Sequence, residues 1–332
     1  MLLTSMDGSK QTQVESCPIC GRTGDNLPIE HGGDYIIYRC SYCHGDFARI
    51  ERRVDYRGEI YKTSGDPVRD SYKLDTLRSP EEHFTEPIRW YTHRLTSNFL
   101  GAFPVKGKLL DVGCGVGVFA KLAEELGFEV YAFDPAEEAI KYAREKFQLK
   151  NTVAGTIGNI PPDWQDFDVI SAIEVIEHVE NPRELVSRIY SLLKPGGCFI
   201  MSVPNRNRIG VKLWGMPEWD VPPNHLTRWS KPVLIFFLAD LGFVHVQIRT
   251  DDLHRRSLSA FLPPKLNRKI TGDKSRRLLC QGPSQESPFA SSPLWKCAQK
   301  TGDGVVFLLR TIAGGVFNQY LANSLIAVAK KP

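Results

Sequence analysis

Three glycines at alternate positions, directly after a short apolar stretch, constrain the fold of this chain more than any other feature. They are Gly113, Gly115 and Gly117. The mostly apolar Leu109–Val112 before them predicts a short strand. Glycine permits the backbone conformations of a tight turn and lets a ligand approach the main chain closely. The four-residue spacing of Val118, Leu122 and Leu126 predicts a helix directly after the turn.

The pattern beyond the turn predicts a parallel sheet. From about residue 107 to residue 250, apolar stretches of strand length alternate with amphipathic stretches of helical length. This alternation is typical of α/β folds with helices on both faces of the sheet. The second strand, Phe128–Asp134, ends in an acid at the distance from the turn at which doubly wound sheets bind ribose hydroxyls. Ser324–Ala329 predicts a last strand.

Two residues argue against a dinucleotide as the ligand of the turn. The dinucleotide pattern requires glycine or alanine at position 118, where this chain has Val118. Asp111, just before the glycines, would repel a pyrophosphate but attract an amine-bearing ligand. Taken alone, the turn is also compatible with another nucleotide or with none.

Through Asp111, the three glycines and Asp134, the chain resembles the class I S-adenosylmethionine-dependent methyltransferases. Four ordered motifs carry the resemblance: the turn with Asp134 after it, Phe167–Val179, Leu192–Asn205 and Pro223–Ser230. The last motif is similar to an element of the subgroup that includes the ubiquinone-biosynthesis O-methyltransferases. The match covers roughly residues 90 to 250 and the closing strand. It implies an α/β, Rossmann-like domain with a mostly parallel seven-stranded sheet and helices on both faces.

The resemblance also implies S-adenosyl-L-methionine as the cofactor and indicates which residues bind it. The glycines would pass under the methionine part, Asp111 would lie near the amino group, and Asp134 would hold the ribose diol. Thr156 and Ile157 stand where the family often has Asp-Ala beside the adenine. The full implied set is Asp111, Gly113, Cys114, Gly115, Gly117, Asp134, Pro135, Thr156, Ile157 and Glu174.

The candidates for catalysis follow the fourth strand, where open α/β sheets bind ligands. His178 is a candidate general base because its imidazole titrates near neutrality, and His225, near Trp229, is a second. Glu177 completes the catalytic set. The run Glu174-x-x-Glu177-His178 also resembles the cluster proposed to hold a divalent metal in the ubiquinone O-methyltransferases. Alternatively, Glu174 shapes the cofactor pocket while Glu177 and His178 are ordinary loop residues.

Four of the eight cysteines form two Cys-x-x-Cys pairs, which predict a zinc ribbon in front of the α/β domain. The four are Cys17, Cys20, Cys40 and Cys43. Four thiolates suit a tetrahedral zinc ion with a structural role, and Tyr35–Tyr38 would form a strand between the pairs. Two disulfides are the alternative, and His44 could replace one ligand. Cys114 fits the turn because its side chain is small, and Cys198 is interpreted as a packing residue.

These observations divide the chain into three parts. Residues 14–50 form the ribbon, 51–103 a connector with helical pieces such as Glu86–Leu100, and 104–332 the methyltransferase domain with a basic insertion at about 251–301. The net charge of +4 is local, because Asp251–Cys280 holds eight Lys or Arg against three Asp. The insertion is either a flap for an anionic or carrier-bound substrate or a solvated segment.

The predicted function is transfer of a methyl group to an O, N or C atom of a small metabolite. The alternative is an RNA base methyltransferase that holds RNA with the ribbon and the basic segment, although an Asn-Pro-Pro-Tyr-like tetrapeptide is missing after strand four. A third reading is a non-catalytic cofactor-binding scaffold. The start lacks a signal-peptide pattern and the chain lacks a stretch that could span a membrane, so we expect a cytoplasmic protein. Neither the methyl acceptor nor the oligomeric state follows from the sequence.

Overall fold

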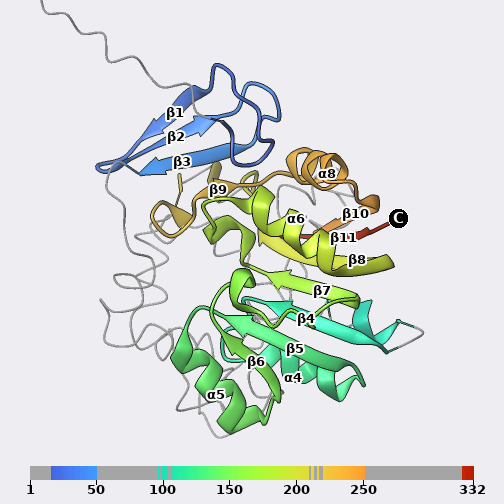
Figure 1. Ribbon diagram of the computed structural model, residues 1–332. Coiled ribbons are helices and arrows are strands. Elements are labelled where there is room, and N and C mark those ends of the chain that lie inside the picture. Colours follow the sequence, from blue (N-terminus) through green and yellow to red (C-terminus); the bar gives the residue numbers. More distant parts are fainter. Residues whose placement is uncertain are drawn as a thin grey trace, which may run out of the picture.

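The computed structural model describes most of the chain in two sheets (Figure 1). The described residues are 16–50, 96, 99–103, 106–208, 211–212, 215–216, 220–250 and 324–332. One sheet has seven strands in the order β10-β11-β8-β7-β4-β5-β6, and the other has four in the order β1-β2-β3-β9. The predicted helix Glu86–Leu100, apart from its last residues, and the basic segment 251–301 lie outside the described residues.

The seven-stranded sheet is mostly parallel, as the sequence predicts. Its parallel strands are β4 (Lys108–Val112), β5 (Glu129–Asp134), β6 (Asn151–Ala154), β7 (Phe167–Ile173) and β8 (Leu193–Pro204). At the other edge, β11 (Ser324–Lys330) runs antiparallel between β8 and β10 (Val244–Thr250). The strand order reverses beside β4, so the carboxyl ends of β4 and β7 border the crevice where such sheets bind ligands.

Helices cover both faces of this sheet, and each face has its own hydrophobic core. The helices are α4 (Val118–Glu125), α5 (Glu137–Phe147), α6 (Pro182–Leu192) and α8 (Lys231–Asp240). Neighbouring residues of one strand point to opposite faces. Leu109 therefore packs with α4 and α5, while Leu110 packs in the core of α6 and α8.

The first helix differs in detail from its prediction. α4 ends at Glu125, one residue before the expected Leu126, and Leu122 is only half-buried. Its buried residues are Val118, Phe119, Ala120 and Ala123. The small alanines let the helix lie close to β4 and β5. The surface that contacts the sheet is therefore centred one position away from the predicted row of Val118, Leu122 and Leu126.

The four-stranded sheet joins segments from far apart in the chain. β1 (Leu27–His31), β2 (Tyr35–Arg39) and β3 (Asp46–Ile50) form an antiparallel ribbon, and β2 confirms the predicted strand between the cysteine pairs. The fourth strand is β9 (Thr227–Arg228), which pairs with β3. Figure 1 shows the ribbon strands, in blue, beside β9 and α8.

The ribbon and the larger domain share one hydrophobic core. Cys17, Ile19 and Phe47 from the ribbon belong to the same buried cluster as Trp229 and Val233. Within the described part of the chain, none of the helices combines the length and apolarity needed to cross a membrane.

Candidate functional site

The turn between β4 and α4 requires glycine at each of its three positions. Gly113, Gly115 and Gly117 have φ values of 65°, 54° and 84°, which residues with a Cβ rarely adopt. A Cβ on Gly113 would lie 2.7 Å from Val175, and one on Gly117 would lie 2.8 Å from Leu149. Without Cβ atoms, the half-buried Gly113 and the buried Gly115 and Gly117 let the main chain of the turn pack closely beside the crevice.

Asp111 places a buried carboxylate beside this turn. Its Oδ1 accepts a hydrogen bond of 2.8 Å from the Ser171 hydroxyl, whereas its Oδ2 has no hydrogen-bond partner in the described part of the chain. Burial raises the pKa of Asp111 to about 7, and the charge of Asp134 adds to the rise. A buried carboxylate oxygen without a donor is suited to an ammonium group of a ligand.

Asp134, at the end of β5, braces the turn from the other side. Its two oxygens accept hydrogen bonds of 2.8 Å from the N–H groups of Gly115 and Ala136. Each carboxylate oxygen can accept a second bond, so the group can also receive hydroxyl donors. Burial raises the pKa of Asp134, as it raises that of the nearby Cys114 thiol. Pro135, the next residue, is exposed.

The residues expected near an adenine follow β6. Thr156 caps the single 3-10 turn Ile157–Asn159, and both its N–H and its hydroxyl donate to Asn159 Oδ1, at 2.9 and 3.0 Å. The hydroxyl proton of Thr156 is therefore engaged, while its oxygen can still accept a bond. Thr156 and Ile157 are both half-buried.

Acidic side chains continue past the end of β7. Glu174 has a φ of 55° and accepts a 2.8 Å hydrogen bond from the hydroxyl of Ser202 on β8. Glu177, on the 3-10 turn Ile176–His178, is 1% exposed, and neither carboxylate oxygen has a hydrogen-bond partner among the described residues. Burial, together with the charge of Glu174, holds the pKa of Glu177 well above its usual range.

His178 and His225 meet beside Glu177. Their rings are 4.6 Å apart in an edge-to-face arrangement, and His178 Nε2 lies 3.8 Å from Glu177 Oε1. His178 Nδ1 makes a 2.7 Å hydrogen bond to the carbonyl of Asn224. Burial lowers the pKa of His178 to about 4, with a contribution from His225, so this ring is neutral at physiological pH.

Two functional candidates escaped the sequence analysis, namely Asp220 and Arg208. The buried Asp220 carboxylate contacts His225 Nδ1 through one oxygen and the Arg208 guanidinium through the other. Burial by itself would raise the pKa of Asp220, but the bond from His225 and the charge of Arg208 bring it below its usual value. We call these three residues the His225 relay. A carboxylate five positions before a histidine in an aperiodic loop gives no recognisable signal.

The expected divalent-metal set is rearranged in the structure. The group whose ligand atoms lie within 4.8 Å of one another consists of Glu177, His178 and His225. Glu174 lies outside this group, with its carboxylate bound to Ser202.

The four cysteines of the ribbon meet in one buried cluster. Their sulfur atoms all lie within 4.8 Å of one another, with Cys17 and Cys43 at 3.8 Å and Cys20 and Cys40 at 3.6 Å. Tetrahedral zinc with Zn–S bonds of about 2.3 Å separates its sulfur ligands by about 3.8 Å. The cysteines are free thiols rather than the alternative disulfides. His44 lies outside the cluster.

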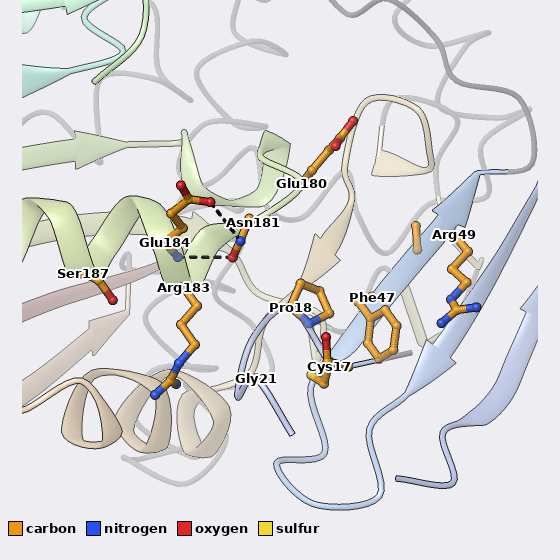
Figure 2. A pocket seen from close by; sticks show the side chains of 12 residues that line it. Cys17, Pro18, Gly21, Phe47, Arg49, Glu180, Asn181, Arg183, Glu184 and Ser187 are labelled. Carbon is orange, nitrogen blue, oxygen red and sulfur yellow. Dashed lines mark hydrogen bonds between the residues drawn. The ribbon is translucent and has the colours of Figure 1, made fainter. Parts of the chain in front are cut away.

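A cleft of about 650 Å³ opens between the ribbon and α6 (Figure 2). Cys17, Phe47 and Arg49 line it on the ribbon side, and Arg183 and Glu184 line it from α6. Both positively and negatively charged side chains line the cleft. It lies apart from the glycine turn, and no residue of that turn lines it.

Comparison with known proteins gives consistent matches. The family described as "Methyltransferase domain" matches residues 84–248. A ubiquinone biosynthesis O-methyltransferase of Idiomarina loihiensis is 35% identical over 129 residues, which is 37% of this chain and 50% of that protein. The protein of the same description from Rickettsia canadensis is 35% identical over 173 residues, 48% of this chain and 72% of that protein. The chain spans about half the length of several curated relatives that it matches.

Among solved structures, Haemonchus contortus phosphoethanolamine N-methyltransferase 2, in complex with S-adenosyl-L-methionine, matches with a TM-score of 0.54 and 16% identity. The match covers 92% of this chain and 71% of that one. At this identity the match establishes the fold.

Proposed function

The chain belongs to the class I S-adenosylmethionine-dependent methyltransferases, in the ubiquinone O-methyltransferase-like subgroup, and we propose that it methylates a hydroxyl oxygen of a small molecule. One observation carries the proposal. The carboxyl ends of β5, β4 and β7 are adjacent, and the residues there include Asp134, the turn Asp111 to Gly117, and Glu174, which interacts electrostatically with the buried His225 relay. We call Asp134 and the turn the cofactor half, and the relay with Glu177 and His178 the acceptor half. Ser171 on β7 and Glu174 just after this strand connect the halves, since Ser171 bonds to Asp111 and Glu174 interacts electrostatically with the charges of the relay.

The residues of the cofactor half fit S-adenosylmethionine. The orphaned Oδ2 of Asp111 would accept from its ammonium group, and the remaining acceptor sites of Asp134 would receive the ribose hydroxyls. When bound, the cofactor supplies a methyl group on a positively charged sulfur. The protein contributes alignment and exclusion of water, because methyl transfer needs little covalent help.

His225 would remove the proton of the acceptor hydroxyl. For this role, Nδ1, which faces Asp220, would carry the ring's proton, and the lone pair that accepts the substrate proton would be on Nε2. Asp220, held by Arg208, would then stabilise the imidazolium ion that forms. The matched relatives are named for a small-molecule acceptor, so an RNA base is not the favoured substrate.

Glu177, His178 and His225 also fit a divalent cation. The two carboxylate oxygens of Glu177 are buried without hydrogen bonds to the described residues, and carboxylate and imidazole are common ligands of such ions. A bound cation would lower the pKa of an acceptor hydroxyl. In the ribbon, the closed set of four thiolates fits zinc with a structural role.

Replacement of Asp134 by alanine should weaken the binding of S-adenosylhomocysteine, the demethylated product, by about a hundredfold or more. Hydrogen bonds to a charged group contribute roughly 1.5–3 kcal/mol each, and two ribose hydroxyls would lose theirs. Titration calorimetry measures the change. Glu129→Gln, on the exposed part of the same strand, is the matched control and should bind normally. Equal affinity of D134A and the parent protein would refute the cofactor half.

The affinity for S-adenosylhomocysteine should be greatest above about pH 7. The Asp111 carboxylate is lost as the pH falls below its pKa of about 7, so affinity should drop about tenfold per pH unit there. The ligand's amino group stays protonated well above this pH, because the neighbouring carboxylate of a free amino acid raises its pKa above that of a peptide amino terminus. Calorimetry between pH 5 and 9 tests this, and Asp111→Asn should flatten the acid limb. If the fall in affinity at low pH persists in D111N, another titrating group causes it.

The same shift affects stability without the cofactor. The pKa of Asp111 is higher in the folded protein than in the unfolded chain. The contribution of this one carboxyl group to the free energy of unfolding is therefore fully present below about pH 4 and is lost as the pH rises through about 7.

A further inference from the structure

The segment that carries His225 is built into the ribbon sheet. β9 begins two residues after His225 and pairs with β3 in the register Phe47 to Thr227 and Asp46 to Arg228. The N–H of Ala48 extends this pairing with a 2.7 Å bond to the carbonyl of Leu226. The segment after His225 therefore completes a sheet whose other strands come from the N-terminal ribbon.

Leu226 connects this sheet to the acceptor half directly. Its carbonyl accepts from the ribbon, while its N–H donates a 2.7 Å hydrogen bond to the backbone carbonyl of Glu177. One residue thus spans the gap between β3 and the 3-10 turn of Glu177 and His178. A displacement of β3 would move both turn and histidine.

An ion network around the buried Asp46 forms a second connection. Asp46, 3% exposed, binds Arg39 through two hydrogen bonds of 2.7 and 3.0 Å, and Arg206 reaches the same carboxylate at 3.0 Å. Arg206 also donates a 2.7 Å bond to the carbonyl of His44. Arg208, two residues further along the chain, holds Asp220 of the relay.

The cysteine cluster sets the shape of the loop from which these links start. The N–H groups of Tyr42 and Gly45 point at the sulfurs of Cys40 and Cys43, each at 3.4 Å. The next residue, Asp46, begins β3. The loop is closed on itself by a 2.9 Å bond from Cys40 N–H to the Gly45 carbonyl. A metal ion bound by the sulfurs would hold this loop, and with it His44 and Asp46, in one arrangement.

The structure assigns the ribbon a role in the active site: it positions the acceptor half, with Asp46 as the positioning residue, and the metal-bound cysteines maintain that position. The contacts that support this join the ribbon to Arg206 and to the segment from Leu226 to Arg228, and Leu226 in turn to Glu177. These residues adjoin the base and its relay in the chain, and none belongs to the glycine turn. This inference rests on the proposed function only where turnover is measured.

Hydrogen–deuterium exchange on the full chain, with its zinc and after chelation, tests the coupling without any assay of activity. After zinc removal, peptides covering residues 220–230 and 174–178 should exchange at least tenfold faster, because the bonds through Leu226 loosen. Peptides covering β4 and the glycine turn should change by less than twofold. Unchanged exchange at 220–230 in zinc-free protein would overturn the proposal.

Asp46→Asn provides the second test, because it leaves all four cysteines and their zinc in place. We expect kcat to fall about 10- to 100-fold, since small displacements of a base have effects of this size. Affinity for S-adenosylhomocysteine should stay within twofold, and zinc content should remain at one ion per chain. Asp240→Asn is the matched control, since it breaks the Arg183–Asp240 pair of α6 and α8, at 2.6 Å, away from the relay. It should behave like the parent protein.

The outcomes separate this inference from the proposed function. If the chain turns over no hydroxyl acceptor, the proposed function fails while the exchange experiment still decides the coupling. If turnover is found but D46N matches the parent protein in kcat, or loses cofactor affinity in proportion to kcat, the positioning role of Asp46 is wrong. If chelation speeds the exchange of all peptides by the same factor, including those of β4 and the glycine turn, the proposal that the metal stabilises the acceptor half selectively is wrong.

Discussion

Replacement of His225 by glutamine should lower kcat by about a thousandfold. General-base catalysis contributes about 10² to 10⁴ in rate, and the burial of His225 excludes water as a ready substitute for the lost base. Because the glycine turn and Asp134 are untouched, affinity for S-adenosylhomocysteine should change by less than threefold. Single-turnover kinetics with labelled cofactor, together with calorimetry, measure both quantities.

The neighbouring Asp220 distinguishes a relay from an isolated histidine. Asp220→Asn should cost a hundredfold or more in kcat, because an amide can neither enforce the Nδ1–H tautomer nor stabilise the imidazolium ion. His31→Gln, at an exposed histidine of β1, is the control. If H225Q retains more than a tenth of the parent kcat, His225 is not the base. If chelation of divalent ions abolishes turnover and H225Q no longer binds such an ion, the residue acts as a metal ligand instead.

Replacement of Cys40 by serine should release the zinc and lower the melting temperature by about 10 °C. Loss of one thiolate from a closed four-ligand site removes several kcal/mol of the metal-binding free energy that stabilises the fold. In a large domain, each kcal/mol corresponds to roughly 2–4 °C. Without a cation, burial raises the pKa of the Cys20 thiol to about 11, and a hydrogen bond with Cys17, together with burial, raises the pKa of Cys43, so these two groups favour the neutral thiol until a metal binds.

Metal analysis and calorimetric melting measure these effects side by side. Cys198→Ala is the control, because this cysteine is also buried but lies in β8 away from the cluster. It should keep one zinc per chain and lose only the small packing contribution of its sulfur. Fresh parent protein with less than half an equivalent of zinc would rule out the metal site.

The shape of the glycine turn could be predicted from the sequence because it is local, while the cofactor-binding roles of its residues stay predictions. Asp111 and the three glycines lie within seven consecutive residues, and the backbone angles of that turn follow from the residue types. Asp134 ends the adjacent parallel strand, where the topology of a doubly wound sheet requires it. The paired cysteines are equally local, since each Cys-x-x-Cys pair forms one loop that presents two sulfurs.

The acceptor half could be predicted only in part. The motifs identified His178, Glu177 and His225, but not that the two rings would meet or that Glu174 would turn to Ser202. Asp220 and Arg208 lie in a stretch without periodicity, so neither spacing nor hydrophobicity indicates their partnership. A side-chain network of this kind depends on where several loops converge.

By itself, then, the sequence determined the alternating strands and helices, the glycine turn and the cluster of four cysteines. Hydrophobic periodicity, short-range sterics and ligand chemistry specify these features. Only the tertiary structure decided that the ribbon shares a sheet with the acceptor half. β9 is two residues long, and its partner Phe47 lies far away in the sequence from Thr227. A pairing so short and so distant has no local preference to reveal it, and it forms because the shared core around Trp229 brings the two segments together.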